Sequence, residues 1–272
     1  MAVVLYWMEI SHPSRAARKM LDLKPVDYEL VDVLPLNQRV HMRLAGFRGG
    51  TVPALKLDGR KLQGSREISR ALDARWPEPP LFPAEPELRA RVEAAERWGD
   101  EELQPIPRRL FRFGVAKIPE LRRWAARSQG LPAPGLVAVA MQPAVSYYAR
   151  TIEADGRRAT EASVRADLAA LGAMLDRADE LLADGTLALE PPNAATLQVL
   201  ATVQALHAFE DLRPVVRAHA CAEPAQRLFG EYPAELPRFL DPAWLEPLRA
   251  GSAVGEPKPG RDAPRGGLSY GT

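Results

Sequence analysis

One proline-containing stretch in the N-terminal third has the residue types of an exposed main-chain binding site. Residues 51–55 read Thr-Val-Pro-Ala-Leu, which predicts a β-strand that the chain enters through Pro53. Proline has no amide hydrogen, and in sheets it occurs at a strand's first residue, at an edge or at a bulge. The main chain at Val52 and Pro53 is therefore expected to direct its hydrogen-bonding groups away from the sheet and toward another partner.

The residues after Pro53 predict a hairpin and a helix that hold this stretch in place. Asp58-Gly59 is a strong signal for a two-residue hairpin, because both central positions of a type I′ turn need positive φ. Leucines on both sides of this turn indicate two short antiparallel strands. A helix is then expected to begin near Gly64 and Ser65.

Composition and charge exclude several classes of chemistry. The 272 residues contain one cysteine, Cys221, which excludes a disulfide framework, a thiolate metal site and a Cys-x-x-Cys redox pair within this sequence. The net charge of +1 gives no global field that would attract nucleic acid or an anionic membrane. No leader pattern surrounds the first ten residues, and no stretch is apolar for the ~20 residues of a membrane helix, so a cytoplasmic protein is expected. The histidines show no ligand spacing: His12, His41, His207 and His219.

The first eighty residues predict a βαβ unit followed by the ββα unit described above. Residues 2–8 form a continuous apolar run, which is typical of a strand buried on both faces. Pro13 fits the first turn of the helix that follows, and residues 28–33 form the second strand. Strand, helix and strand within about thirty residues predict parallel strands joined by a right-handed crossover. Residues 34–49 are expected to form a loop with one short helix.

After a proline-dense connector at residues 76–83, the strand signals stop and helical patterns take over. Residues 160–182 give the clearest helical period, and residues 193–209 are apolar almost all round, as expected of the central helix of a bundle. Residues 215–229 predict one further helix, and residues 251–272, dense in glycine and proline, predict a disordered tail. Arg108 to Phe113 interleaves basic and aromatic residues, which we interpret as a kinked helix lining the cleft between two domains and not as a nucleic-acid interface.

This order of elements resembles the cytosolic glutathione transferases. In that family an α/β thioredoxin-like N-terminal domain, βαβ-ββα, precedes an all-α C-terminal helical bundle. The resemblance implies a glutathione-binding domain over residues 1–80 and an all-helical domain over residues 86–245. It also implies glutathione as a co-substrate with no metal, a small-molecule electrophile as the second substrate, and a homodimer. Partners of the nucleic-acid and membrane classes are not expected.

The resemblance also assigns roles to individual residues. Val52-Pro53 matches the family's cis-proline, whose preceding residue offers its backbone N–H and C=O to the cysteinyl part of glutathione, as in a short β-addition. Ser65 matches the serine that receives the γ-glutamyl carboxylate at a helix N-terminus. Ser11 matches the catalytic position of the serine-using and cysteine-using classes, where a donated hydrogen bond lowers the thiol pKa of glutathione.

The sequence departs from the family pattern in two places. Gly64 stands where Glu or Gln usually precedes the carboxylate-binding serine, so one side-chain contact is missing. At the start of the buried helix, Asn193 and Thr196 replace the usual Ser or Thr cap and the Asp three residues on, which changes the capping chemistry but keeps it feasible.

Each site assignment has a structural alternative. Ser11 also fits a plain helix N-cap, and Ser14 is the alternative donor to the sulfur. Tyr6 points to the face of the strand opposite to Trp7, where the family's tyrosine would lie, so it is expected in the core. Four further residues are candidates for the glycyl carboxylate, although each also fits a solvated loop: Gln38, Arg39, His41 and Arg48.

The sequence therefore predicts a glutathione transferase-like enzyme of the detoxification type. Its predicted chemistry is activation of the glutathione thiol for conjugation, or for isomerisation or dehalogenation of a small electrophile. Two alternatives remain open: a non-catalytic binding or interaction module with the same fold, and a transferase that uses a different thiol, for which Gly64 is the relevant change.

Overall fold

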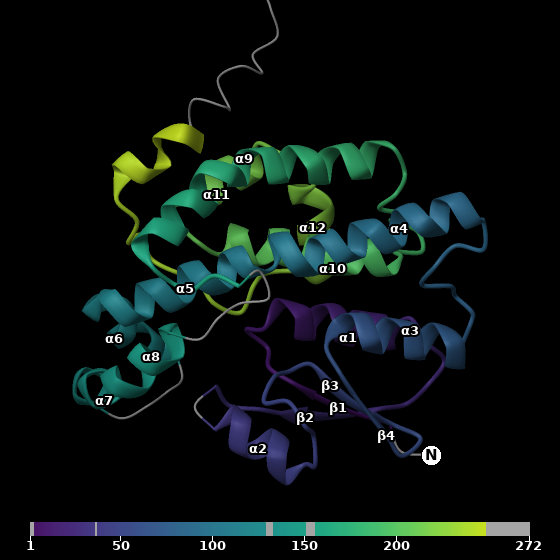
Figure 1. The fold of residues 1–272 in the computed structure, drawn as a ribbon, viewed down its shortest axis with the longest axis horizontal. Coiled ribbons are helices and arrows are strands. Elements are labelled where there is room, and N and C mark those ends of the chain that lie inside the picture. The colour runs from purple at the N-terminus through teal and green to yellow at the C-terminus, as the bar shows by residue number, and fades with distance from the viewer. Residues whose placement is uncertain (1–2, 36, 129–132, 151–155, 249–272) are drawn as a thin grey trace, which may run out of the picture.

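The computed structural model describes residues 3–35, 37–128, 133–150 and 156–248, and the predicted tail at residues 251–272 lies outside this part. A small α/β layer carries the N-terminus, and a larger helical layer covers one face of its sheet (Figure 1). The fold confirms the predicted class, an α/β N-terminal domain followed by helices.

The sheet has four strands in the order β2-β1-β3-β4. β1 is parallel to β2 and antiparallel to β3, and β3 is antiparallel to β4. Asp58 and Gly59 have φ values of 50° and 80°, so the turn between β3 and β4 has the predicted positive φ at both central positions. The strands are β1 (Val3–Trp7), β2 (Glu29–Asp32), β3 (Ala54–Leu57) and β4 (Arg60–Gln63).

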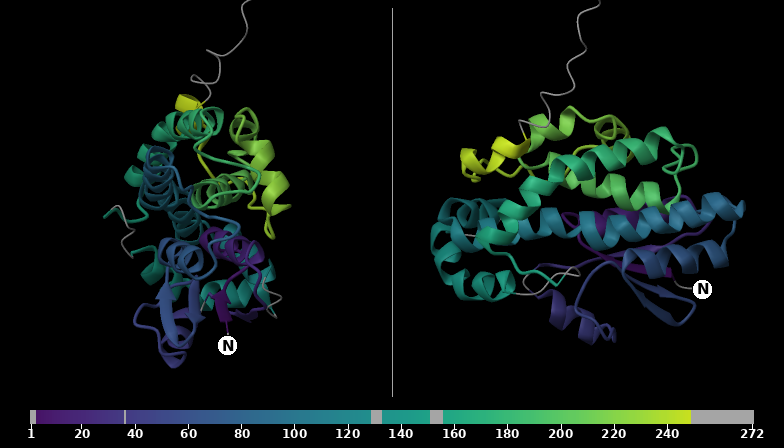
Figure 2. Two further views of the ribbon diagram at one scale, coloured as in Figure 1. Left: turned by 90° about the vertical axis from the view of Figure 1, so that its right-hand side faces the viewer. Right: turned by 45° about the horizontal axis from the view of Figure 1, so that its top comes forward.

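Helices cover both faces of this sheet, as Figures 1 and 2 show. α1 (His12–Asp22) and α3 (Ser65–Arg75) lie between the sheet and the helical layer. α2 (Gln38–Leu44) lies on the other face, where Met42 packs with Tyr6 and Phe47 in a second, smaller core cluster. The burial of Tyr6 in that cluster confirms that it is a core residue.

The helical layer is built around α10 (Ala194–His207). Every residue of this helix except His207 is buried, which confirms its predicted central place. It lies against helices of both layers, and one hydrophobic core runs continuously from the sheet into the bundle. Asn193 caps α10 by accepting a hydrogen bond from the Thr196 amide at 2.9 Å, so the cap survives the change of residue types.

The other described helices surround this core. One departure from the sequence prediction is the region of residues 215–229, which forms two helices because Pro224 cannot continue a helix from the preceding turn and the second helix restarts just before it. These elements are α4 (Pro86–Trp98), the π-helix η1 (Gly99–Leu103), α5 (Pro105–Lys117), α6 (Pro119–Ser128), α7 (Pro134–Ala140), α8 (Gln142–Ala149), α9 (Glu161–Ala183), α11 (Arg213–Arg217), α12 (Ala222–Phe229) and the 3₁₀ helix η2 (Pro242–Leu245).

Candidate functional site

The strand order of the sheet brings the predicted site residues together at one end of three neighbouring strands, which we call the site edge of the sheet. Tyr6, near the end of β1, pairs with Ala54 at the start of β3, and Ala54 pairs with Gln63 at the end of β4. The segments that follow β1, precede β3 and follow β4 therefore leave the sheet at the same edge. These segments carry Ser11, Val52-Pro53 and Gly64-Ser65, and the Gly64 amide donates to the Pro53 carbonyl at 2.9 Å.

Val52 supplies main-chain groups that the fold itself does not use. The Val52-Pro53 peptide bond is cis, and β3 begins only at Ala54. Within the described residues, neither the N–H nor the C=O of Val52 takes part in a hydrogen bond. An extended ligand could therefore add to this edge through main-chain hydrogen bonds, as a strand does in β-augmentation.

Gln63 holds the loop that leads to Val52. Its side-chain oxygen accepts a hydrogen bond from the Gly49 amide at 2.7 Å, and its nitrogen donates to the Thr51 carbonyl at 3.0 Å. A Cβ on Gly49 would lie 2.7 Å from the same Gln63 oxygen, so any side chain at this position would displace the Gln63 amide. Sequence reasoning missed this role, because the contact joins residues fourteen positions apart.

Ser11 is the N-cap of α1. Its hydroxyl oxygen accepts a long hydrogen bond, 3.4 Å, from the Ser14 amide, and its side chain is half-buried. Because that bond uses the oxygen as an acceptor, the hydroxyl hydrogen stays available for donation. Ser14 is fully buried, and its hydroxyl has no hydrogen-bond partner among the described residues.

Residues from the end of the helical layer fix the segment that carries Ser11. The Tyr232 hydroxyl donates to the carbonyl of Ile10, the residue before Ser11. Arg15 donates to the Phe229 carbonyl at 2.5 Å, and its guanidinium lies 5.6 Å from the centre of the Tyr232 ring. Burial raises the pKa of Tyr232, which keeps its phenol protonated as a donor. The Ser11 segment is thus positioned by residues more than two hundred positions away.

His12 lies directly behind Ser11 and is almost completely buried. Burial and, to a lesser extent, the Arg108 charge lower the pKa of its imidazole to about 3, against the opposing effect of a hydrogen bond to the Gln104 main chain. The side chain is therefore neutral at pH 7, and its Nε2 atom has no hydrogen-bond partner among the described residues. Through this contact, the first turn of α1 touches the junction between η1 and α5.

The N-terminus of α3 is an open anion site by its main-chain geometry. Gly64 is the N-cap residue with φ of 91°, and no side chain caps the helix. No hydrogen bond engages the N–H groups of Ser65, Arg66 or Glu67 within the described residues. The positive end of the helix dipole and these free donors favour a carboxylate. The nearest acid on the helix itself is Glu67, whose carboxylate accepts from the Gln63 amide at 2.9 Å.

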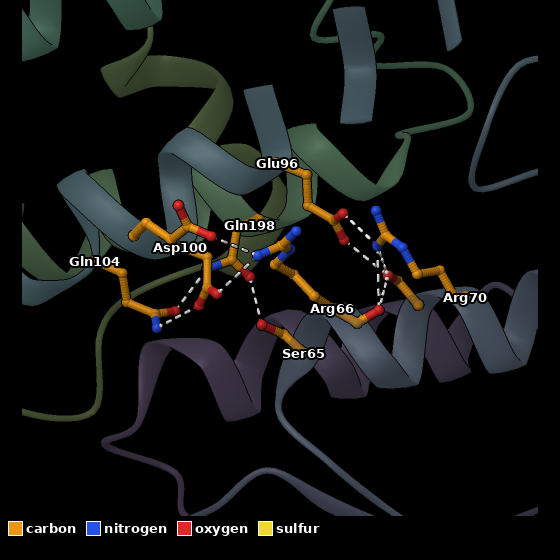
Figure 3. A network of polar contacts seen from close by, with 9 residues as sticks. Ser65, Arg66, Arg70, Glu96, Asp100, Gln104 and Gln198 are labelled. Carbon is orange, nitrogen blue, oxygen red and sulfur yellow. Dashed lines mark hydrogen bonds and ion pairs between the residues drawn. The ribbon is translucent and has the colours of Figure 1, made fainter. Parts of the chain in front are cut away.

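The Ser65 side chain points into the helical layer, as Figure 3 shows. Its hydroxyl donates to Oε1 of Gln198 at 2.6 Å, and only 2% of Ser65 is exposed. Nε2 of Gln198 donates to Gln104 at 2.6 Å, and Gln104 donates to Asp100 at 2.9 Å. The Ser65 hydroxyl hydrogen is therefore already committed to a buried partner before any ligand arrives.

Asp100, at the end of this chain of side chains, determines which group donates in each of its hydrogen bonds. Burial raises the pKa of Asp100, while the Arg66 charge opposes that rise, and Arg66 lies 3.7 Å from its carboxylate. An ionised carboxylate only accepts hydrogen bonds, so Gln104 must present its NH₂ group to Asp100 and its oxygen to Gln198. Because the Gln104 oxygen accepts from the NH₂ group of Gln198, the oxygen of Gln198 faces the Ser65 hydroxyl and accepts from it.

A second buried acid ties α3 to α4. Glu96 accepts from the Ser69 hydroxyl at 2.7 Å and from Arg70 at 2.5 Å (Figure 3). Burial raises the pKa of Glu96, and the Arg70 and Ser69 hydrogen bonds act in the opposite direction. These bonds hold the helix that presents the anion site against the helical layer.

The three α2 candidates lie apart from this network. Gln38 is half-buried, and the His41 ring packs edge-on against Tyr6 with ring centres 6.0 Å apart. Arg39 lies over the ring of Tyr147 in α8 at 5.9 Å and reaches its hydroxyl at 3.5 Å. α2 therefore touches the helical layer through Arg39, beside the edge where the other site residues gather.

The cavities elsewhere in the described chain do not include the predicted site residues. No group of three or more His, Cys, Asp or Glu side chains in residues 3–35, 37–128, 133–150 and 156–248 could hold a metal ion. A cavity of about 370 Å³ lies beside η2 and is lined by residues such as Glu210 and Arg238, none of which is a predicted site residue. Within the described part, no helix is long and apolar enough to span a membrane.

Comparison with known proteins connects this geometry to a family. Residues 5–80 match the family model described as glutathione S-transferase, N-terminal domain. A search of curated proteins finds no match to the chain. The match confirms the predicted resemblance to glutathione transferases for the N-terminal domain.

Solved structures extend the likeness to the helical layer. β-Etherase LigF from Sphingobium superposes with a TM-score of 0.57 at 21% identity, covering 76% of this chain and 84% of its own. A glutathione S-transferase from Sinorhizobium meliloti gives 0.53 at 19% identity, covering 92% and 93%. FzlA from C. crescentus gives 0.54 at 16% identity, covering 91% and 99%. These similarities show the glutathione transferase fold over both layers.

Proposed function

We propose, from the premise that residues 5–80 are a glutathione S-transferase N-terminal domain, that this chain binds reduced glutathione and activates its thiol. The observation that carries the proposal is the meeting of three unused groups at one sheet edge. They are the hydroxyl hydrogen of Ser11, the main chain of Val52 and the N–H groups at the start of α3. Each suits one part of a tripeptide thiol with a free carboxylate.

Val52 would hold the peptide part of the ligand. Its N–H and C=O can pair with the main chain of an extended cysteinyl residue, which fixes the ligand's direction and places its sulfur near the segment after β1. Gln63 supports this step by fixing the loop from Gly49 to Thr51, so the donors need not be ordered when the ligand arrives.

The N-terminus of α3 would hold the γ-glutamyl carboxylate through its main-chain N–H groups. The Ser65 hydroxyl is buried and donates to Gln198, so its part is to hold the first turn of the helix. Gly64 adds no side-chain contact to the ligand. We expect the anion to be bound by the backbone and the helix dipole.

Ser11 would act on the sulfur. Donation from its hydroxyl favours the charged form of the thiol and so lowers its pKa, which raises the fraction of thiolate at pH 7. The thiolate sulfur then forms a bond to an electrophilic carbon, and the electron pair leaves with the departing group or is taken up by the acceptor. Ser14 is the weaker candidate, because its side chain is fully buried.

Calorimetric titration with reduced glutathione tests the proposal, with Ser11→Ala and S-methylglutathione as comparisons. We expect binding between micromolar and millimolar Kd, retained for Ser11→Ala and for the S-methyl ligand, because neither change touches the main-chain contacts. An electrophile screen should include an ether, since one similar structure is named a β-etherase. Absence of heat and of competition at millimolar glutathione would reject the assignment.

A non-catalytic binding module is the second candidate, and the committed hydroxyl of Ser65 favours it. The two functions differ in one measurement. A module would bind glutathione without lowering its thiol pKa, and no electrophile would be consumed faster with the protein than without it. The family expectation of a homodimer is a separate proposal, which sedimentation equilibrium of the purified protein checks.

A further inference from the structure

The large hydrophobic side chains that are exposed in the described part of the chain come from only two segments. Leu44 of α2 is 83% exposed, and Leu136 of α7 is 76% exposed. Scattered exposed hydrophobics are normal on protein surfaces, whereas a gathered set marks an interaction site. We call this set the apolar face: Leu34, Val40 and Leu44 around α2, and Leu136, Val139, Tyr147 and Tyr148 in α7 and α8.

The two segments belong to one surface. Arg39 of α2 stacks on Tyr147 of α8, and Figures 1 and 2 show α2 beside the α7–α8 pair. Within α2, Val40 and Leu44 are four residues apart and so share a side of the helix. Leu136 and Val139 are three apart in α7 and share a side in the same way.

The same segments concentrate positive charge. Residues 33–57 contain four basic residues and no acidic one, and residues 117–150 contain five basic residues and one acidic residue. Together they carry a formal charge of +8, whereas the whole chain carries +1. Four of the arginines are exposed and form no ion pair within the described residues: Arg43, Arg48, Arg127 and Arg150.

An uncharged stretch lies at the centre of this basic region. Residues 133–149, which form α7 and α8, contain no Asp, Glu, Lys or Arg. Aliphatic side chains, tyrosines and flanking arginines are the composition of protein segments that lie in the interface of a bilayer. Short helices without spanning length suit that position, because they can bury one side without crossing.

The positive charge and the apolar side chains of this face distinguish between three classes of partner. A second copy of the chain would bring together two faces with exposed arginines that are unpaired within the described residues, which disfavours self-association through this face. Nucleic acid would use the arginines and the tyrosines but would leave the exposed leucines and valines in water. We propose that the apolar face docks on an anionic lipid surface, with the aliphatic and tyrosine side chains at the headgroup boundary and the arginines on the headgroups.

This proposal replaces the expectation, drawn from the net charge, that the chain has no membrane partner. The net charge averages a basic region against an acidic remainder, whereas a surface responds to the local charge within about a Debye length. Because the face includes α2, whose Arg39 and His41 lie beside the candidate site, an apolar electrophile dissolved in the lipid would be close to that site.

Co-sedimentation with vesicles tests the proposal on the full chain. The probes are phosphatidylcholine vesicles with and without roughly one third phosphatidylserine. One variant removes charge, Arg43→Ser with Arg48→Ser, and another removes apolar surface, Leu44→Ser with Leu136→Ser and Val139→Ser. Arg91→Ser with Arg97→Ser, which changes two exposed arginines of α4, is the charge-matched control.

We expect binding to the phosphatidylserine vesicles and not to phosphatidylcholine alone. At about fivefold for each arginine near the surface, the charge variant should bind about 25-fold more weakly. The apolar variant should lose at least about tenfold, because buried hydrocarbon contributes as well as charge. The control should bind like the unmodified chain, and the far-ultraviolet circular dichroism of all variants should match it.

Three results would overturn the proposal. One is no binding to either vesicle. Another is binding that the apolar variant retains in full, which would mean an electrostatic contact without docking of this face. The last is equal loss in the control and the charge variant, which would place the contact elsewhere. An acidic protein as the true partner would appear as the first of these results.

Discussion

Replacement of Gln198 by leucine should uncouple the Ser65 side chain from the helical layer. Gln198 is 1% exposed, accepts from Ser65 and donates to Gln104, and both partners are buried. Leaving one buried polar group without a partner costs about 1–3 kcal/mol, so two should cost about 2–6 kcal/mol. Burying the leucine offsets about 1–2 kcal/mol of this, so we expect a net loss of roughly 0–5 kcal/mol.

A double-mutant cycle with Ser65→Ala isolates the contact, with urea unfolding as the assay. If the hydroxyl is committed to Gln198, the second substitution should cost less in the presence of the first, with a coupling free energy of about 1–2 kcal/mol. Gln204→Leu is the matched control, because Gln204 is a buried glutamine of the same helix that donates to the Gly230 carbonyl and not to this network. It should show no coupling to Ser65→Ala.

The cycle also bears on ligand binding. If main-chain groups hold the carboxylate, Gln198→Leu should leave the glutathione Kd within about threefold, since no donor to the ligand is removed. Strictly additive losses of stability, or equal coupling for the Gln204 control, would refute the proposed commitment of the hydroxyl. A large loss of affinity without loss of stability would refute it as well.

Three further predictions concern other parts of the framework. Arg109 is 0% exposed and bonds both oxygens of Asp167 at 2.6 and 2.8 Å, and the more exposed Arg157 pairs with the same carboxylate at 2.9 Å. Arg109→Leu should therefore cost about 3 kcal/mol in urea unfolding, the lower end of the range for breaking a buried ion pair, and the double change with Asp167→Leu should cost less. The pKa of His12 is about 3 in the folded chain and 6.5 in the unfolded chain, so between these pH values only the unfolded state gains the proton. The free energy of unfolding should therefore decrease as the pH is lowered through this range, by up to about 1.4 kcal/mol per pH unit. His12→Gln should flatten that slope in denaturation measured from about pH 7 to about pH 4. Gln63→Leu should weaken glutathione binding about tenfold by calorimetry, because the loop at Gly49 loses its support, whereas Gln63→Glu keeps the acceptor and should recover part of that loss.

The sequence predicted the parts of this fold whose signals are local. Asp58-Gly59 specifies its own turn, and the Asn193 cap lies three residues from the amide it bonds. Pro53 marks the start of β3 because the missing N–H is a property of that residue alone. Such features need no knowledge of the rest of the chain.

The supports of the candidate site were not predictable in this way. Tyr232 reaches Ile10, and Gln198 reaches Ser65, across more than one hundred residues, and no spacing rule connects them. The one available signal was that Gln198 is a polar residue in a mostly apolar stretch, which indicates a buried hydrogen bond but does not identify the partner. The break before Pro224 has a local cause, because proline in a helix interior removes a hydrogen bond, and the prediction of one helix over residues 215–229 did not take it into account.

The most direct test of the central claim is the thiol pKa of glutathione bound to this chain, followed by the ultraviolet absorbance of the thiolate as pH is varied. We predict a pKa below that of free glutathione, and a return toward the free value in Ser11→Ala with binding retained, because the proposal assigns to the Ser11 hydroxyl the donation of a hydrogen bond to the sulfur. An unshifted pKa in the unmodified chain, or the same lowered pKa in Ser11→Ala, would contradict the account.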